Sequence, residues 1–131
     1  RARIPDPTDP ATFQRCKLDW NSVGQSPHAD WLDFHRRLLA VRRREICPRL
    51  TGMHEEAVRY SLIAGRGLSI RWTLGDDSVL SLLANYSGVQ LEGLPRPAGS
   101  VLWAEPREAE HALTQGCLPP WSLLWFLRDA A

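Results

Sequence analysis

The fold is decided by the stretch Leu68-Ser-Ile-Arg-Trp-Thr-Leu74-Gly-Asp-Asp-Ser-Val79-Leu-Ser-Leu-Leu-Ala-Asn-Tyr86. Its first part alternates apolar and polar side chains, which is the two-residue period of a half-buried strand. Gly75-Asp-Asp77 then supplies the residues of a tight hairpin. The part from Val79 to Tyr86 is more continuously apolar, as in a central strand that is covered on both faces. The stretch therefore predicts two antiparallel strands at the centre of a sheet.

Further strands flank this pair. Val58, Tyr60 and Leu62 alternate with polar residues and predict another half-buried strand, which the turn Gly65-Arg-Gly67 joins to the next. Short apolar runs at 101–104 and 122–127 predict two more, separated by a polar loop over 105–116. We expect a mostly β chain, with an antiparallel β-sheet or sandwich of five or six strands over residues 58–131.

A helix precedes the strands. Ser26 is suited to cap it, Pro27 to occupy its first position, and the apolar residues after them recur at three- and four-residue steps up to about Arg44. Upstream, residues 1–26 are rich in proline and predict an extended segment, while residues 46–57 predict a linker. The helix is expected to bury one apolar stripe, formed by Trp31, Phe34, Leu38 and Val41.

Composition excludes several classes of partner. The formal net charge of +1 disfavours nucleic acid and anionic membranes, and no apolar run reaches the length of a membrane span. Cys16, Cys47 and Cys117 fit no disulfide framework or zinc site, so we expect free thiols and a cytoplasmic protein. The chain starts at Arg1 without Met, which suggests a piece of a longer protein.

Catalytic machinery is not evident in the sequence. A glycosidase needs two opposed carboxylates, one of them with a raised pKa, whereas the acidic residues here occupy turns and polar loops. The four histidines have no ligand-type spacing. We therefore expect no catalytic residue, no metal and no cofactor.

Six tryptophans in 131 residues suggest carbohydrate binding, because sugar-binding modules stack aromatic side chains against pyranose rings. Trp31, Trp72 and Trp125 are in phase with apolar neighbours, and core packing accounts for them. The other three, Trp20, Trp103 and Trp121, remain candidates for a surface platform.

Several stretches resemble the C-terminal region of the malto-oligosyltrehalose trehalohydrolases, a family of the α-amylase superfamily. They are Asp6-Pro-Thr-Asp-Pro-Ala-Thr-Phe13, Lys17-Leu-Asp-Trp20, Pro27-His-Ala, Leu38-Leu-Ala-Val-Arg-Arg43, Leu82-Leu-Ala-Asn85 and Gly116-Cys-Leu-Pro-Pro-Trp-Ser-Leu-Leu-Trp-Phe-Leu127. The resemblance implies that residues 1–45 correspond to the last loop and outer helix of a (β/α)8 catalytic barrel, and residues 58–131 to the antiparallel β-domain that follows it. In the family the catalytic Asp, Glu and second Asp lie upstream of this region.

The resemblance implies a non-catalytic accessory domain that covers the barrel of a glycoside hydrolase, with the rest of that barrel as its partner. The parent enzyme would hydrolyse the α-1,4 bond next to the terminal trehalose of maltooligosyl trehalose. Asp9 and Lys17 would approach one edge of its substrate groove. Two alternatives stay open. One is a module that binds α-1,4-glucan oligosaccharides, and the other is the same region of another α-amylase superfamily enzyme, such as a branching or debranching enzyme.

Overall fold

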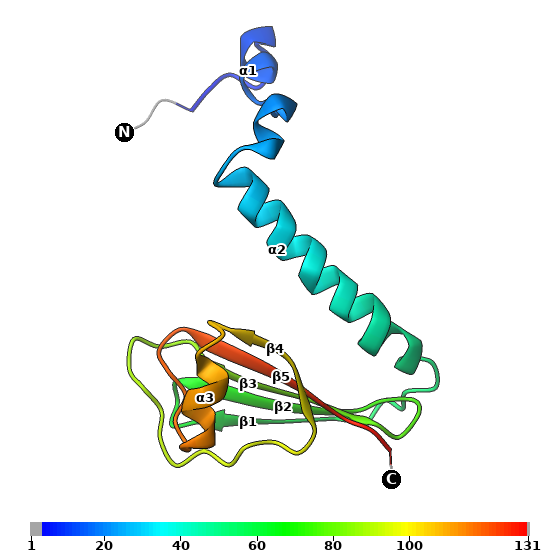
Figure 1. Ribbon diagram of the computed structural model, residues 1–131. Coiled ribbons are helices and arrows are strands. Elements are labelled where there is room, and N and C mark those ends of the chain that lie inside the picture. The colour runs from blue at the N-terminus through cyan, green and yellow to red at the C-terminus, as the bar shows by residue number, and fades with distance from the viewer. Residues whose placement is uncertain (1–3, 131) are drawn as a thin grey trace. The chain divides into compact units, whose positions relative to one another are not determined.

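The computed structural model describes residues 4–130, which divide into two compact units, residues 4–37 and residues 38–130 (Figure 1). The first, which we call the leading unit, is helical, and the second, which we call the sheet unit, contains a β-sheet. Each unit is described by itself below.

The leading segment is not extended as predicted, because it contains two short helices. Helix α1 spans Pro10–Arg15 and a 3-10 helix, η1, spans Trp20–Gly24. An aspartate starts each of them: Asp9 Oδ1 accepts a hydrogen bond from the Ala11 amide at 2.8 Å, and Asp19 Oδ1 accepts one from the Asn21 amide at 3.0 Å. The prolines of this segment thus mark a helix start as well as chain extension, since proline is tolerated in the first helical turn.

Helix α2 spans His28–Val41, and its start lies one residue after the predicted position. The Ser26 hydroxyl donates to Asp30 Oδ2 at 2.8 Å, so this side chain contacts another side chain instead of the helix backbone. The helix continues as a π-helical turn, η2 (Arg42–Ile46), and a 3-10 turn, η3 (Cys47–Arg49). Trp31 was predicted to be buried but is 61% exposed.

The second unit confirms the predicted antiparallel sheet. Its five strands lie in the order β1-β2-β3-β5-β4, with every neighbouring pair antiparallel. Strand β3 is central and buried along its whole length, as its continuous apolar sequence predicted. The strands are β1 (Val58–Ile63), β2 (Gly67–Thr73), β3 (Val79–Asn85), β4 (Ser100–Glu105) and β5 (Ser122–Arg128).

A short helix covers part of one face of the sheet. Helix α3 (Ala109–Thr114) forms where a polar loop was predicted. Ala109 and Leu113 are four residues apart, so they share one side of the helix, and both are buried in a cluster with Leu124 and Phe126 of β5. A helix of six residues is too short to establish a helical period in the sequence, and tertiary burial stabilises it.

The opposite face carries the aromatic side chains. Trp72 of β2 and Trp125 of β5 stack with ring centroids 5.4 Å apart and planes 17° from parallel. Leu80 and Leu127 are buried beside them, together with Leu74. This face therefore has an apolar core of its own, and the sheet is covered by different elements on its two sides.

Strand β1 departs from the prediction of a half-buried strand. Tyr60 is 76% exposed and Leu62 72% exposed, although both alternate with polar residues as expected. Pairing places them opposite Ile70 and Leu68 of β2, on the aromatic face of the sheet. The alternation thus identified the apolar face correctly, but no other element described in the sheet unit covers that face at β1.

Candidate functional site

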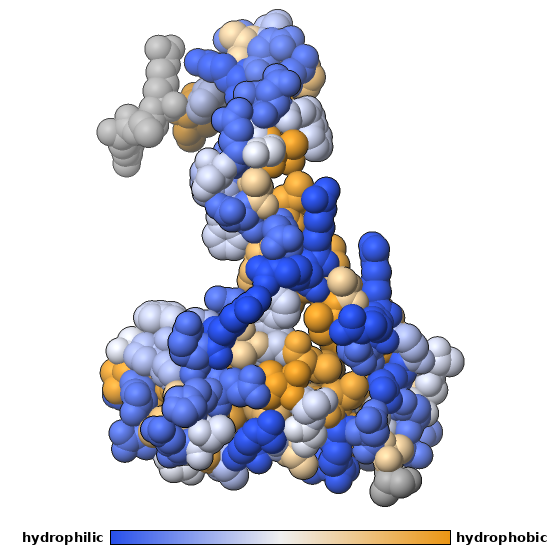
Figure 2. Space-filling model, in the orientation of Figure 1, coloured by the Kyte–Doolittle hydropathy of each residue, from blue (hydrophilic) through white to orange (hydrophobic). Residues whose placement is uncertain are grey.

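An apolar groove of about 410 Å³ lies on the aromatic face of the sheet unit, where apolar side chains gather (Figure 2). Residues from the end of α2, the turns that follow it and four strands line the groove. They are Leu38, Val41, Arg42, Ile46, Leu50, Met53, Trp72, Leu74, Leu80, Leu102, Trp103 and Trp125. Ile46 and Met53, within the stretch expected to be a linker, pack against the core beneath it.

Trp103 reaches this groove because of a β-bulge. Val101 pairs with Phe126 and Trp103 pairs with Trp125, so Leu102 is the extra residue of β4. Simple alternation would put Val101 and Trp103 on the same face of the sheet. The bulge instead turns Trp103 to the face of Trp125, as bulges re-aim side chains elsewhere.

The chemistry of the groove favours apolar contact over sugar binding. Arg42 is the one charged residue of its lining, and the remaining side chains offer indole N–H groups as their polar atoms. A sugar ring needs several hydrogen-bond partners for its hydroxyls, because a polar group buried without a partner costs about 1–3 kcal/mol. Half-buried Trp103 is better placed for packing than for a sugar platform.

Trp121 is the most exposed candidate of the sheet unit. Its side chain is 69% exposed, and its backbone has a φ of 52°, which bulky residues rarely adopt. Its amide donates to Ser87 O at 3.1 Å. The carbonyl groups just before it, of Leu118 and Pro119, accept from the buried Asn85 amide at 3.2 and 2.9 Å. Hydrogen bonds therefore hold the backbone that carries this exposed indole.

The other three candidates lie in the leading unit. Asp9 caps α1, and Lys17 Nζ lies 4.8 Å from the centre of the Phe13 ring, so both side chains have local structural partners. Trp20 begins η1 and is 75% exposed. The substrate contacts predicted for Asp9 and Lys17 remain predictions.

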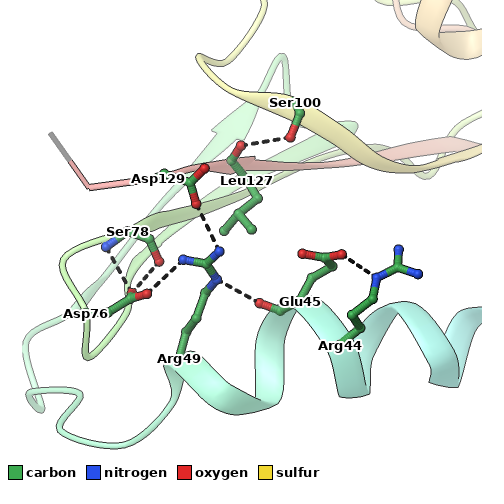
Figure 3. Close-up of polar contacts among 8 residues, drawn as sticks. All are labelled: Arg44, Glu45, Arg49, Asp76, Ser78, Ser100, Leu127 and Asp129. Carbon is green, nitrogen blue, oxygen red and sulfur yellow. Dashed lines mark hydrogen bonds and ion pairs between the residues drawn. The ribbon is translucent and has the colours of Figure 1, made fainter.

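Arg49 is a residue whose role the sequence did not indicate. Its side chain lies between two carboxylates, with Nη1 2.8 Å from Asp76 Oδ2 and Nη2 2.9 Å from Asp129 Oδ1, while its Nε donates to Glu45 O at 3.0 Å (Figure 3). The Gly75 amide also donates to Arg49 O at 2.7 Å. Arg49 thus joins the turn after α2, the β2–β3 hairpin and the end of β5, which are distant in sequence. The residues next to Arg49 in the sequence, such as Pro48, do not indicate this role.

The two carboxyl groups with shifted pKa values, Asp76 and Asp6, do not point to acid catalysis. Hydrogen bonds from the Ser78 hydroxyl and amide, together with Arg49, hold the pKa of Asp76 below its ordinary value, and hydrogen bonds from Thr8 do the same for the pKa of Asp6. A general acid needs the opposite shift. Among residues 4–130, no three His, Cys, Asp or Glu side chains are grouped so that they could hold a metal ion. No helix in this range combines the length and apolarity of a membrane span.

A family model described as "Domain of unknown function (DUF3459)" matches residues 55–125, which is more than half of the chain. The chain belongs to the DUF3459 family. The match covers all five strands except the last residues of β5, so the family corresponds to the sheet unit.

The similarity to curated relatives extends beyond the DUF3459 match. Malto-oligosyltrehalose trehalohydrolases from Brevibacterium helvolum and Rhizobium sp. (strain M-11) are 32% and 31% identical over 92% and 98% of this chain. That of Mycobacterium tuberculosis is 55% identical over 42 residues. The chain spans 19% and 20% of the first two relatives. The resemblance stated from the sequence is thereby confirmed.

A solved structure agrees with this DUF3459 fold. A Salmonella typhimurium protein described as an α-amylase is 32% identical, with a TM-score of 0.83 over 97% of this chain and 20% of that one. The chain therefore resembles the C-terminal domain of α-amylase-family glycoside hydrolases.

Proposed function

We propose that this chain is the non-catalytic accessory domain of a trehalose-forming glycoside hydrolase. The parent would cleave the α-1,4 bond next to the terminal trehalose of maltooligosyl trehalose, in trehalose biosynthesis. The observation that carries this proposal is the identity of 31–32% with two malto-oligosyltrehalose trehalohydrolases over almost the whole chain. The catalytic residues would lie in the rest of the parent, and this chain would be inactive alone.

The partner of the domain would be the catalytic barrel. Exposed apolar side chains in each unit support this role: Trp31 on α2, and Tyr60 and Leu62 on β1. Apolar surface of this kind marks interaction sites. Burial of one such large side chain would contribute about 1.5–3 kcal/mol, so a few of them would stabilise the barrel measurably.

The parent would reside in the cytoplasm. Cys16, Cys47 and Cys117 are all free in the structure. Unpaired cysteines of this number are typical of proteins in a reducing compartment.

A chimera tests the accessory role. The region of the Rhizobium sp. relative that aligns with this chain is replaced by residues 1–131, and trehalose release from maltooligosyl trehalose is compared with that of the intact and truncated relative. The chimera is expected to recover activity and thermal stability that the truncated enzyme lacks. Equal behaviour of chimera and truncated enzyme would contradict the proposal. To test the alternative parent, residues 1–131 replace the equivalent region of a branching enzyme, and recovery of branching activity would support that alternative.

Variants of the chimera locate the contact. Tyr60→Ser combined with Leu62→Ser is expected to lower the melting temperature of the chimera by several degrees. The same double variant should not change the melting temperature of the isolated chain, because both side chains are exposed there. Val89→Ser is the matched control, since Val89 is exposed in a loop outside the strands. An equal loss in both variants would argue against contact through β1.

A second candidate function is binding of α-1,4-glucan oligosaccharides, and the exposed Trp121, whose backbone is held by hydrogen bonds, favours it. Calorimetric titration of the chain with maltooligosaccharides tests it, with Trp121→Ala and the half-buried Trp103→Ala as a pair. Heat that Trp121→Ala abolishes would support a sugar-binding module. Absence of heat at millimolar sugar would exclude it.

A further inference from the structure

A second groove, of about 360 Å³, lies on the sheet face opposite the aromatic one, and its lining combines apolar side chains with serines and arginines. Strand residues form its floor, and residues 94–98 of the loop before β4 form one wall. Three arginines line it, namely Arg71, Arg96 and Arg128, as do three serines, namely Ser61, Ser69 and Ser81. We call this the serine–arginine groove.

The register of the sheet places Ser81 among the arginines. Arg71 on β2 pairs with Ser81 on β3, and Ser81 pairs with Phe126 on β5, so these three side chains form one row across the face. The guanidinium of Arg96 lies over the Phe126 ring, 5.1 Å from its centre. Arg128 is two residues along β5 from Phe126, on the same face. Arg71 and Arg128 thus lie on the two strands that flank the strand of Ser81, and Arg96 lies over the ring that pairs with Ser81.

The spacing allows the arginines to share one ligand. Arg71 and Arg128 lie two strand spacings apart and two residues out of line, which corresponds to Cα atoms about 12 Å apart. Two long side chains on the same face can meet across that distance. Arg96 is held in place by the Phe126 ring, and its Nη1 donates to Pro97 O and Gly99 O at 3.4 and 3.2 Å.

The charges of the groove are not balanced within the described residues. The side chains of Arg71 and Arg128 make no ion pair or hydrogen bond among residues 4–130, and the Arg96 side chain contacts carbonyl oxygens and an aromatic ring. The one acidic residue of the five strands, Glu105, pairs with Leu123 and therefore belongs to the opposite face. An anion would relieve the repulsion between these guanidinium groups.

The hydroxyl groups are also without partners. Those of Ser61, Ser69 and Ser81 line the same groove and make no hydrogen bond within residues 4–130, and none of the three oxygens is sealed from solvent. These hydroxyl groups are therefore available to donate to a ligand in the groove. Serine hydroxyls and arginine forks are the donors that oxyanions prefer.

We propose that the serine–arginine groove binds a phosphate group, either as inorganic phosphate or as part of a sugar phosphate, with Arg71, Arg96 and Arg128 around it and Ser81 donating from the floor. Three positive charges match a dianion better than a monovalent carboxylate. The groove is at the lower end of the size range of small-molecule sites, so it has room for more than one phosphate group. This proposal is independent of the parent enzyme's activity.

Calorimetry and thermal unfolding of the chain test the proposal. Inorganic phosphate, glucose 6-phosphate, glucose and sodium chloride are compared at matched ionic strength. Phosphate is expected to bind and to raise the melting temperature, whereas chloride and glucose are not. Tighter binding of glucose 6-phosphate than of phosphate would identify the sugar phosphate as the ligand class. Added salt should weaken the binding of both phosphate and glucose 6-phosphate, because the three arginines are exposed to solvent.

Variants assign the site. Arg71→Gln combined with Arg128→Gln is expected to weaken phosphate binding at least tenfold, and Ser81→Ala severalfold, since charge-assisted hydrogen bonds are the stronger ones. Arg43→Gln, an exposed arginine of the turn after α2, is the matched control and should leave binding unchanged. Circular dichroism verifies that each variant is folded. If the double variant unfolds, Arg96→Gln takes its place in the phosphate titration. No phosphate-specific effect, or equal binding by the wild-type chain and a folded arginine variant, would overturn the proposal.

Discussion

The contacts within the leading unit differ in kind from the contacts within the sheet unit. In residues 4–37 no side chain is buried, and every side-chain hydrogen bond from Thr8 to His35 joins residues at most four positions apart. In the sheet unit, by contrast, the side-chain amide of Asn85 donates hydrogen bonds to carbonyl groups 33 and 34 positions away. Local signals suffice to shape short helices, but isolated short helices are marginal in water. The sheet unit is therefore expected to carry the stability of this chain.

The largest expected effect contrasts two phenylalanines. Phe126→Ala removes a fully buried ring and should lower the free energy of unfolding by about 3–5 kcal/mol. Phe13→Ala, at a ring that is 63% exposed, should change it by less than about 0.5 kcal/mol. Denaturant unfolding measures both. A comparable loss in the two variants would mean that the leading unit is integrated with the core.

Two glycines provide the next contrast. A Cβ on Gly75 would lie 1.7 Å from Thr51 O, where the turn after α2 passes the β2–β3 hairpin, so Gly75→Ala should cost about 3 kcal/mol. A Cβ on Gly24 would have no atom within 4 Å, and Gly24→Ala should be nearly neutral. Melting curves distinguish these outcomes. A neutral Gly75→Ala would show that the turn is not fixed against the hairpin.

Two asparagines test the buried polar contacts. Asn85→Ala leaves the carbonyl groups of Val89, Leu118 and Pro119 without their shared donor and should cost about 2 kcal/mol. Asn21→Ala is the control in the leading unit, because its side chain is exposed. Hydrogen exchange should also show faster opening of residues 118–121 in Asn85→Ala. Equal exchange in both variants would contradict the anchoring role.

The smallest effect concerns ion pairs and has a defined pH dependence. The pKa of Asp76 is lowered in the folded chain, so its contribution to stability is present above its ordinary pKa of about 3.9 and is lost as the pH falls through the lower, folded value. Asp76→Asn should therefore lower the melting temperature modestly at pH 7 and cease to matter below that range. Asp33→Asn, at an exposed i,i+4 pair on α2, should have almost no effect. An Asp76→Asn effect that persists unchanged at pH 2 would show that its carboxylate charge is irrelevant.

Sequence reasoning predicted the strands well because each carries a two-residue alternation or a continuous apolar run. It did not predict α1 and α3, whose six residues hold too few apolar positions to establish a helical period. The alternation at β1 assigned the apolar face, yet exposure depends on which element covers that face. Of the candidate site residues, the three indole groups of Trp20, Trp103 and Trp121 were named from composition, which carries no information about exposure.

The sequence by itself therefore determined the strand segments, the hairpin at Gly75-Asp-Asp77, the central place of β3 and the relationship to the trehalohydrolases, since these depend on local pattern or residue identity. The tertiary structure decided which residues meet. The bulge at Leu102 turned Trp103 to the aromatic face, Arg49 joined three distant segments, and strand register gathered Arg71, Ser81 and Arg128. The physical reason is that pairing register and long-range burial arise between segments, so no single segment encodes them.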